Sequence, residues 1–361
     1  MTGASVNAGA LLAPLLGFAL TLFLLRVLIP KARRYGLVDH PAAGRKDSGS
    51  GTPTIGGLAI VASLALTALL AQFASQVHPA FWAGLCLIAL TGTLDDLFDL
   101  QPAIKFAAQI AAALLMVYWG GLQLHTLGDL VSDKPLLLGR LAVPLTVFAV
   151  IGVVNAINLC DGADGLGGGL VFIAVFWIAL MSALGSSSGT LELLLAMLGC
   201  IAAFLACNMR SPWRSRAAVF LGDAGSLSLG FALAWLTVAA AQPQAPLFAP
   251  VTAIWLVAIP ISDTIVCMTR RLLKGQNPFR ADRTHLHHIL IDLGMSVGAA
   301  VALIHLIAFA LAAAGVAGWA LQVQEHHMFY TAMAVFALYI VLVQTGLHRV
   351  SATQAARVHK I

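Results

Sequence analysis

Charged side chains are scarce in this chain. Only 10% of its 361 residues are Asp, Glu, Lys or Arg, whereas 60% are hydrophobic and the mean hydropathy is +0.92. A soluble domain carries about 25% charged residues, so this composition excludes an ordinary soluble protein and predicts an integral membrane protein. The hydrophobic runs are too long and continuous for the strands of a membrane barrel, which alternate and last about ten residues.

Cysteine is also sparse, and its positions exclude two kinds of site. The five cysteines lie in hydrophobic segments or at their expected cytoplasmic ends: Cys86, Cys160, Cys200, Cys207 and Cys267. No disulfide framework is expected, because none lies in an outside loop. No Cys-x-x-Cys pair points to zinc. We find no repeat, no low-complexity linker and no soluble domain, so 1–361 is expected to form a single membrane domain.

Hydrophobic windows recur along the whole length. Because a helical span needs roughly 17–25 residues, we expect an all-α polytopic membrane protein with about eleven transmembrane helices. The expected spans are 8–30, 54–73, 80–94, 104–119, 141–157, 168–184, 190–207, 226–241, 249–268, 298–318 and 328–346. The longest stretch outside them, 269–297, is expected to be a cytoplasmic loop.

The basic residues predict the orientation of these spans. No Lys or Arg precedes the first span, and Arg26 is the first of several at its end. Cytoplasmic loops carry an excess of Lys and Arg, so we expect the N-terminus outside, the C-terminus in the cytoplasm, and no cleavable signal peptide. With eleven spans, 18 of the 20 basic residues lie inside, and only Lys134 and Arg140 lie outside. The net charge of +5 is then a topology signal, and no motif supports nucleic-acid binding.

Five of the 15 acidic residues fall in two short strings at span ends. These are Asp95-Asp96-Leu97-Phe98-Asp99 and Asn155 to Asp164, the second of which carries Asp161 and Asp164. Carboxylates are costly at membrane segments unless function retains them. On a helix Asp99 would share a face with Asp95 and Asp96, and Mg²⁺ would relieve the repulsion between them. A solvated helix end paired with Lys105 is the alternative.

Three further polar clusters are expected on the same cytoplasmic face. In the Asn155–Gly165 string, glycines permit close approach of a ligand and amides can read a base edge, although an Asx-rich turn would look similar. Gly222–Ser226 places Asp223 at a helix start that suits phosphate or an ordinary N-cap. His285, His287 and His288, with nearby Arg283, could clamp pyrophosphate, bind zinc, or form a plain surface loop. Arg210, Arg214 and Arg216 are interpreted as topology anchors.

Together these motifs resemble the polyprenyl-phosphate N-acetylhexosamine-1-phosphate transferase superfamily, glycosyltransferase family 4. Within it the chain is similar to the undecaprenyl-phosphate GlcNAc-1-phosphate transferases that initiate O-antigen and related glycans. The resemblance runs from about Gly36 to His288, through Gly36–Asp39, Arg45-Lys46, Pro53–Gly57, Leu94–Asp99, Asn155–Leu166, Val219–Ser226 and Pro278–His288.

The resemblance implies roles by matching position. Asp95 and Asp96 match the acidic pair that deprotonates or orients the polyprenyl phosphate, and Asp223 and Asn158 match the Mg²⁺ ligands, with Mn²⁺ as a substitute ion. The expected substrate contacts are Asp164 and Phe220 for the uracil, Asn155 and Asp161 in the same pocket, Arg283, His285, His287 and His288 for pyrophosphate and sugar, and Lys105 and Asp99.

Two positions discriminate within the superfamily. The muramyl-pentapeptide branch usually has Lys where Asp99 stands and three consecutive histidines, so Asp99 and the His-Leu-His-His sequence favour the N-acetylhexosamine branch. Ser48 departs from the family, which often has His there, so any role of that His is absent or taken over.

The implied reaction moves a sugar-1-phosphate from a UDP-N-acetylhexosamine to undecaprenyl phosphate and releases UMP, at the cytoplasmic face of a bacterial inner membrane. UDP-GlcNAc is the default donor, and GalNAc, QuiNAc or FucNAc nucleotides stay open, as does a homodimer. A secondary transporter is the main rival class, but its site usually lies near the bilayer midplane in repeated halves. A membrane phosphatase is the rival enzyme.

Overall fold

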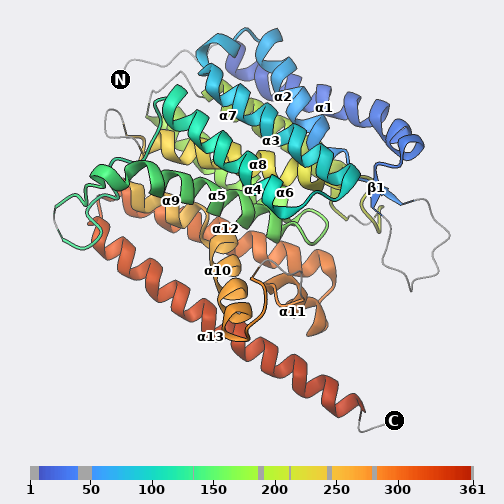
Figure 1. The fold of residues 1–361 in the computed structure, drawn as a ribbon, viewed down its shortest axis with the longest axis vertical. Coiled ribbons are helices and arrows are strands. Elements are labelled where there is room, and N and C mark those ends of the chain that lie inside the picture. The colour runs from blue at the N-terminus through green and yellow to red at the C-terminus, as the bar shows by residue number, and fades with distance from the viewer. Residues whose placement is uncertain are drawn as a thin grey trace.

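The computed structural model describes residues 8–39, 51–132, 134–185, 191–210, 213–241, 246–278 and 283–358. Nearly all of its regular structure is helical (Figure 1). The helices are α1 (Ala8–Tyr35), α2 (Gly56–Leu70), α3 (Pro79–Phe98), α4 (Pro102–Leu114), α5 (Ala142–Cys160), α6 (Leu166–Leu184), α7 (Leu191–Asn208), α8 (Gly222–Ala240), α9 (Pro250–Leu256), α10 (Ala258–Leu273), α11 (Leu286–Asp292), α12 (Val297–Ala320) and α13 (Glu325–Val358).

Short elements complete the described chain. Single turns lie at η1 (Ala74–Gln76), η2 (Leu115–Trp119) and η3 (Gly139–Leu141). Strands β1 (Val38–Asp39) and β2 (Thr52–Pro53) form a small antiparallel pair in which Val38 lies opposite Pro53.

Each of the eleven expected spans coincides with a helix or a helix pair. In the described ranges, nine helices, some with an adjoining turn, are long and apolar enough to cross a membrane. The other two expected spans coincide with α2, which has only 15 residues, and with α9 and α10, which meet at a bend of 75°. The chain is an all-α polytopic membrane protein, and the count of eleven spans stays a prediction.

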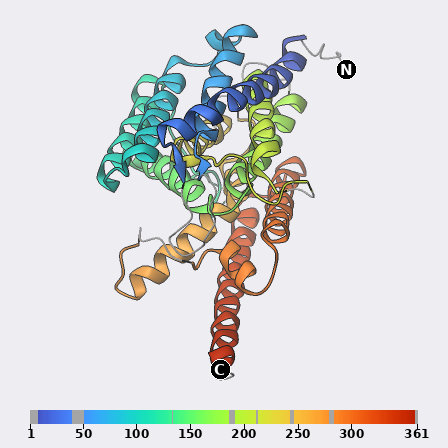
Figure 2. The same ribbon diagram turned by 90° about the vertical axis from the view of Figure 1, so that its right-hand side faces the viewer.

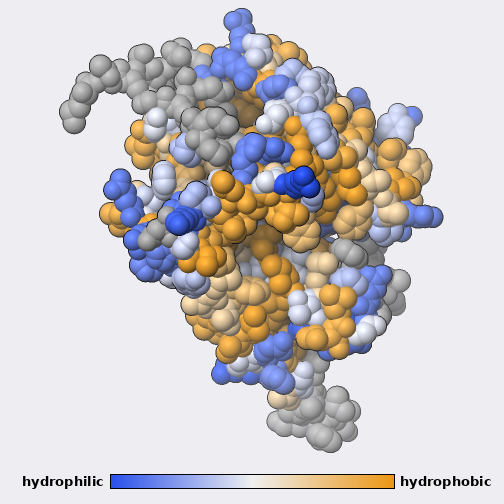
Figure 3. Space-filling view, turned by 60° about the vertical axis from the view of Figure 1, so that its left-hand side comes forward, coloured by the Kyte–Doolittle hydropathy of each residue, from blue (hydrophilic) through white to orange (hydrophobic). Residues whose placement is uncertain are grey.

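The outer surface of the bundle is hydrophobic, as a lipid-facing surface requires. Large apolar side chains are exposed along several helices, including Leu15 and Phe23 on α1, Phe148 on α5 and Leu342 on α13. Figure 3 shows hydrophobic residues covering much of one face, with polar residues gathered in smaller clusters. Such a surface suits hydrocarbon because helices satisfy their own backbone hydrogen bonds.

Helix α8 forms the centre of the bundle, and small residues bring its neighbours close. A Cβ atom added to Gly57 of α2 would lie 2.0 Å from the backbone of Gly225 in α8, and one added to Gly92 of α3 would lie 2.5 Å from that of Ala224. Close backbone approach through small residues is typical of membrane helix packing. The first turn of α8 is therefore held between α2 and α3.

The C-terminal part of the molecule extends from this bundle. In Figure 2, α10 projects to one side of the bundle and α13 descends to the C-terminus. Helix α11 lies beside α12 and α13 (Figure 1). It falls within the predicted loop 269–297, between the end of α10 and the start of α12.

Candidate active site

A polar cavity of about 470 Å³ opens where α3, α5 and α8 meet the loops before α2, α6 and α8. It is lined by Val38, Asp39, Thr54, Asp96, Asn158, Asp161, Gly162, Ala163, Asp164, Asn208, Phe220, Leu221, Gly222, Asp223 and Ser226. Six of these are expected site residues: Asp96, Asn158, Asp161, Asp164, Phe220 and Asp223. The two acidic strings and the start of α8, far apart in sequence, therefore converge on one cavity.

Lys105 of α4 joins the acidic residues of two helices. Its Nζ lies 2.7 Å from Asp95 Oδ2 and 3.2 Å from Asp223 Oδ2. The other carboxylate oxygen of Asp95 accepts a hydrogen bond of 2.8 Å from the backbone N–H of Leu100. Asp95 is 8% exposed, so it lies behind the cavity lining. The ammonium group neutralises part of the negative charge that α3 and α8 bring together.

The neighbouring Asp96 contacts the start of α8 directly. Its two carboxylate oxygens accept hydrogen bonds from the backbone N–H groups of Asp223, at 2.8 Å, and Ala224, at 3.1 Å. These are among the N–H groups that a helix start leaves without a partner inside the helix. Gly222 makes room for this contact: its φ is +71°, and an added Cβ would lie 2.6 Å from Asp96 Oδ2.

Asp223, Asn158 and Ser226 form a hydrogen-bonded group at the cavity wall. The Asn158 amide donates to Asp223 Oδ1 and to Ser226 Oγ, both at 2.9 Å. Ser226 in turn donates to the Gly222 carbonyl at 3.1 Å. One carboxylate oxygen of Asp223 thus accepts a hydrogen bond from Asn158, and the other is paired with the ammonium group of Lys105. Its orientation is fixed by α5 and α4 as well as by its own helix.

The loop between α5 and α6 carries two acids with different partners. Burial raises the pKa of Asp161 well above its ordinary range, and the nearby carboxylates of Asp223, Asp164 and Asp96 raise it further. Asp164 instead accepts a hydrogen bond of 2.7 Å from Arg210 Nε. An excess of carboxylates around one cavity favours a cation there.

Asn208 holds this loop in place. Its Oδ1 accepts a 2.6 Å hydrogen bond from the backbone N–H of Gly165, and its Nδ2 donates to the Val219 carbonyl at 2.8 Å. Gly165 has φ +86°, a conformation that glycine adopts without strain. The end of α7 therefore ties the loop before α6 to the segment before α8.

Backbone pairing positions Phe220 on the cavity wall. Its N–H donates to the Pro53 carbonyl at 2.7 Å, and its carbonyl accepts from the N–H of Gly56 at 3.0 Å. The Pro53–Gly57 motif and the Val219–Ser226 motif are therefore adjacent in space. An aromatic ring fixed by its backbone in this way offers a rigid stacking surface.

The histidine loop approaches the cavity from behind. His287 is 2% exposed, and an added Cβ on Gly162 would lie 2.6 Å from its Nε2. Burial and the neighbouring His288 lower the pKa of His287 to about 4. His288 packs on His287 with ring centroids 4.1 Å apart. His287 therefore lies against Gly162, a residue of the cavity lining.

Two other members of that loop face elsewhere. His285 Nδ1 lies 2.7 Å from Asp263 Oδ2; burial alone would lower the pKa of His285, but the hydrogen bond and charge of Asp263 raise it to about 10. Arg283 is largely exposed and pairs with Asp292 at 2.9 Å. Neither side chain lines the cavity.

Two residues of the acidic strings also differ from expectation in their placement. The Asn155 amide donates to Gln109 Oε1 at 2.6 Å and to the Ile151 carbonyl at 2.8 Å, away from the cavity lining. The prediction that Asp99 shares a helical face with Asp95 and Asp96 is wrong. Helix α3 ends at Phe98, and Asp99 is exposed with φ +50°, because the backbone turns into a left-handed conformation there.

Five other residues of the motifs lie outside the described residues: Arg45, Lys46, Ser48, Arg280 and Asp282.

Three contributors to this region were not predicted as site residues from the sequence. Asn208 ends an apolar span and Asp263 lies within one, and a polar residue in a span is itself a signal of function. Arg210 was interpreted only as a topology anchor, yet it pairs with Asp164. No local pattern connects these two residues.

The donor set fits a hard divalent cation. Asp223, Asp161 and Asp96 supply carboxylate oxygens on one cavity, and Asn158 supplies an amide. Such oxygen ligands suit Mg²⁺ or Mn²⁺. No Cys or His lines the cavity in the described ranges, so the set does not match a zinc site.

Comparison with known proteins decides the family. The model of glycosyl transferase family 4 matches residues 78–241. The undecaprenyl-phosphate α-N-acetylglucosaminyl 1-phosphate transferase of Escherichia coli O157:H7 is 33% identical over 309 residues, which cover 85% of this chain and 84% of that protein. The chain belongs to glycosyl transferase family 4.

Proteins of the same name from other bacteria agree with this assignment. That of Yersinia pestis is 35% identical over 312 residues, covering 85% of this chain and 84% of that protein. That of Haemophilus influenzae is 32% identical over 325 residues, covering 90% of each chain. The family match includes Asp95, Asp96, Asn158, Asp161 and Asp223, so the polar cavity lies largely within the part of the chain that defines this glycosyl transferase.

Proposed function

We propose that this glycosyl transferase moves GlcNAc-1-phosphate from UDP-GlcNAc to undecaprenyl phosphate and releases UMP, as the names of its relatives describe for them. The convergence of Asp96, Asp223 and Asn158 on one polar cavity carries the proposal. The product would initiate a lipid-linked glycan such as O-antigen.

The transfer consists of one substitution at phosphorus. A phosphate oxygen of undecaprenyl phosphate attacks the β-phosphorus of UDP-GlcNAc and forms the new phosphorus–oxygen bond. The bond from that phosphorus to the α–β bridging oxygen breaks, and UMP takes the electron pair. In-line transfers of this kind depend on positioning and on neutralised charge.

Each wall of the cavity has a role in this scheme. Asp96, on the cavity wall with Asp95 behind it, would orient the acceptor phosphate and take its proton. Asp223 and Asn158 would hold Mg²⁺, which when bound neutralises charge on the phosphate oxygens. Lys105, between Asp95 and Asp223, would keep the acidic groups at a fixed separation.

The donor nucleotide would contact other residues of the same lining. Phe220 would stack on the uracil, and Asp164, with Arg210 behind it, would accept a hydrogen bond from the base. Asp161 lines the same cavity. His287 would serve the pyrophosphate and the sugar from its position against Gly162, whereas Arg283, which pairs with Asp292, faces away from the cavity.

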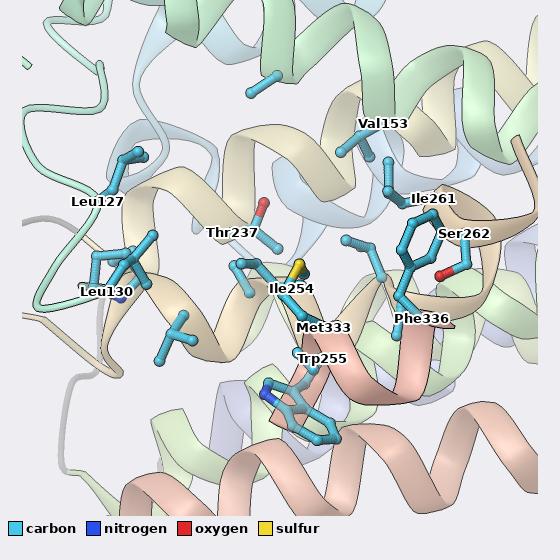
Figure 4. Close-up of a pocket in the computed structure, with 18 of the residues that line it drawn as sticks. Leu127, Leu130, Val153, Thr237, Ile254, Trp255, Ile261, Ser262, Met333 and Phe336 are labelled. Carbon is cyan, nitrogen blue, oxygen red and sulfur yellow. The ribbon is translucent and has the colours of Figure 1, made fainter. Parts of the chain in front are cut away.

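The polyprenyl tail needs an apolar channel, and a cavity of about 390 Å³ meets this need. Figure 4 shows Val153 of α5, Ile261 of α10 and Phe336 of α13 at one end of it, with Leu127 at the other. Its lining is almost wholly hydrocarbon. Helix α5 lines both cavities, through Val153 and Asn158, and so could lead the lipid to the acidic groups.

The proposal requires the polar cavity to face the cytoplasm, because a UDP-sugar is water-soluble and the phosphate of the lipid lies at the interface. We propose eleven spans, with the N-terminus outside and the C-terminus inside a bacterial inner membrane.

Cysteine labelling tests this orientation. In a background without other reactive cysteines, a cysteine at Ser215 or Thr284 should be protected from an impermeant thiol reagent in intact cells, while one at Ser132 should be labelled. Ser215 and Ser132 are both exposed, so the membrane alone would account for the difference. Labelling of Ser215→Cys in intact cells would reject the topology.

Replacement of Phe220 tests the uracil site. Loss of one base-stacking contact costs about 1–3 kcal/mol, so Phe220→Ala should raise KM for the UDP-sugar by roughly tenfold or more with a smaller effect on kcat. Phe148→Ala is the matched control, because Phe148 is 74% exposed on α5. An unchanged KM in folded Phe220→Ala protein would remove Phe220 from the nucleotide site.

Product analysis separates the proposed enzyme from its rivals. Purified protein with Mg²⁺, undecaprenyl phosphate and a panel of UDP-sugars should release UMP in step with lipid product. A phosphatase would release inorganic phosphate, and a transporter would release neither. UDP-GlcNAc should be the best donor in the panel, and a clear preference for another UDP-N-acetylhexosamine would change the sugar assignment only.

A further inference from the structure

One buried acid contacts the histidine loop instead of the polar cavity. Asp263 lies on α10, the second half of the bent pair, and is 3% exposed. Its Oδ1 accepts hydrogen bonds from the Tyr339 hydroxyl at 2.7 Å and from the Leu286 backbone N–H at 2.9 Å. Its Oδ2 lies 2.7 Å from His285 Nδ1. The Sγ atom of Cys160, the last residue of α5, also contacts Oδ2 at 3.8 Å. Four elements, α5, α10, α11 and α13, therefore meet on a single carboxylate (Figure 1).

These contacts fix the position of α11. Leu286 is its first residue and His285 its N-cap, so Asp263 bonds both the cap and the first backbone N–H. Seven residues are too few for a helix to be stable alone, so its place depends on such contacts. Arg271, which is 2% exposed, adds a contact of 3.3 Å to His285 Nε2 and donates to the Pro278 carbonyl at 2.6 Å.

Helix α11 carries His287 to the back of the cavity. The Nε2 atom of His287 is buried and has no hydrogen-bond partner in the described ranges. It lies against Gly162, which lines the polar cavity between Asp161 and Asp164. A movement of α11 would therefore shift His287 against the loop that carries both acids.

We infer that Asp263 and Tyr339 are positioning residues for the transfer: they hold His285 and the start of α11, and so seat His287 against Gly162. The inference rests on the proposed function and adds to it a connection from α13, through Asp263, to the α5–α6 loop. Neither residue lines the polar cavity; the route that we assign to them runs through α11 and His287.

A buried metal is the competing explanation. Asp263, Cys267 and His285 have ligand atoms within 4.8 Å of one another. Asp263, however, already accepts from Tyr339 and Leu286, and the Arg271 guanidinium lies on the far side of the imidazole. A positive group at that position opposes a cation. The contacts on the Asp263 carboxylate therefore favour a hydrogen-bonded structural role over a metal site.

A double-mutant cycle tests the inference. Removing one partner of a buried charged hydrogen bond is costly, so Asp263→Asn should lower kcat by about tenfold or more. In a His287→Ala background the same change should lower kcat by less than about twofold, because interacting sites are not additive. Tyr339→Phe, which keeps the Asp263–His285 pair, should repeat this pattern with a smaller loss and covers the case that Asp263→Asn does not fold.

Two further measurements complete the test. Hydrogen exchange of the α11 amides should be about tenfold faster in Tyr339→Phe than in wild type, with α3 and α8 unchanged; this readout needs no activity. Cys267→Ser should keep wild-type kcat. If the wild type is active, an equal fold-loss of kcat in the wild-type and His287→Ala backgrounds would overturn the inference. Unchanged hydrogen exchange of the α11 amides would do so too, as would stoichiometric zinc that is lost in Cys267→Ser. A wild type that releases no UMP would reject the proposed function instead.

Discussion

Asp223→Asn is expected to lower kcat by about 100-fold or more, equivalent to roughly 2.7 kcal/mol of transition-state stabilisation. Asparagine keeps the size of the side chain but deletes the charge that a hard cation prefers. The Mg²⁺ concentration for half-maximal activity should rise as well. Steady-state kinetics of UMP release over a Mg²⁺ and Mn²⁺ series measure both effects.

A matched control distinguishes the loss of a carboxylate at the polar cavity from the loss of a carboxylate elsewhere in the chain. Asp129→Asn changes an acid in the loop before α5, remote in sequence from every residue that lines the polar cavity, and should leave kcat and the Mg²⁺ dependence at wild-type values. Normal turnover of Asp223→Asn at an unchanged Mg²⁺ requirement would contradict the proposed role. Asp223 would then only complete the first turn of α8, and the metal would belong with Asp95, Asp96 or Asp161.

Gly92→Ala is expected to have the second-largest effect, although it changes no polar group. The added Cβ would lie 2.5 Å from backbone atoms of Ala224, so α3 must move away from α8. Asp96 would then lose its hydrogen bonds to the first turn of α8. A displacement of about 1 Å in a catalytic site can cost 100-fold in rate, and overpacking costs about 1–3 kcal/mol. We expect kcat to fall at least about tenfold and Tm in detergent to fall.

Gly152→Ala is the control for this change. Gly152 is also a helical glycine, on α5, but no heavy atom lies within 4 Å of an added Cβ there. Alanine favours a helix by about 1 kcal/mol over glycine, so Tm should stay level or rise while kcat is unchanged. Wild-type activity of Gly92→Ala would show that the α3–α8 contact does not set the spacing of the acids.

Much of the fold could be predicted because each membrane span is a local, continuous hydrophobic run. All eleven expected segments coincide with helices or a helix pair. The 75° bend between α9 and α10 could not be read from hydrophobicity, since both halves are apolar enough for one span. The end of α3 was misplaced for a related reason: the left-handed turn at Asp99 leaves no signal in helical spacing.

The site was partly predictable for the same physical reason. Charges in an apolar chain point to Asp95, Asp96, Asp161 and Asp223 without any knowledge of packing. The partner of each acid depends on tertiary packing. The sequence offers no reason why Asp96 should accept hydrogen bonds from the start of α8 while Asp95 pairs with Lys105. Pairings across many residues depend on how helices pack, and no local pattern encodes them.

The reaction itself is most directly tested by following the β-phosphate. Purified protein should be incubated with Mg²⁺, undecaprenyl phosphate and UDP-GlcNAc labelled at that phosphorus. The account predicts that the label passes into organic-extractable lipid, with one UMP released per label transferred and no turnover without the lipid. Label retained in UDP, or recovered as inorganic phosphate, would contradict sugar-1-phosphate transfer.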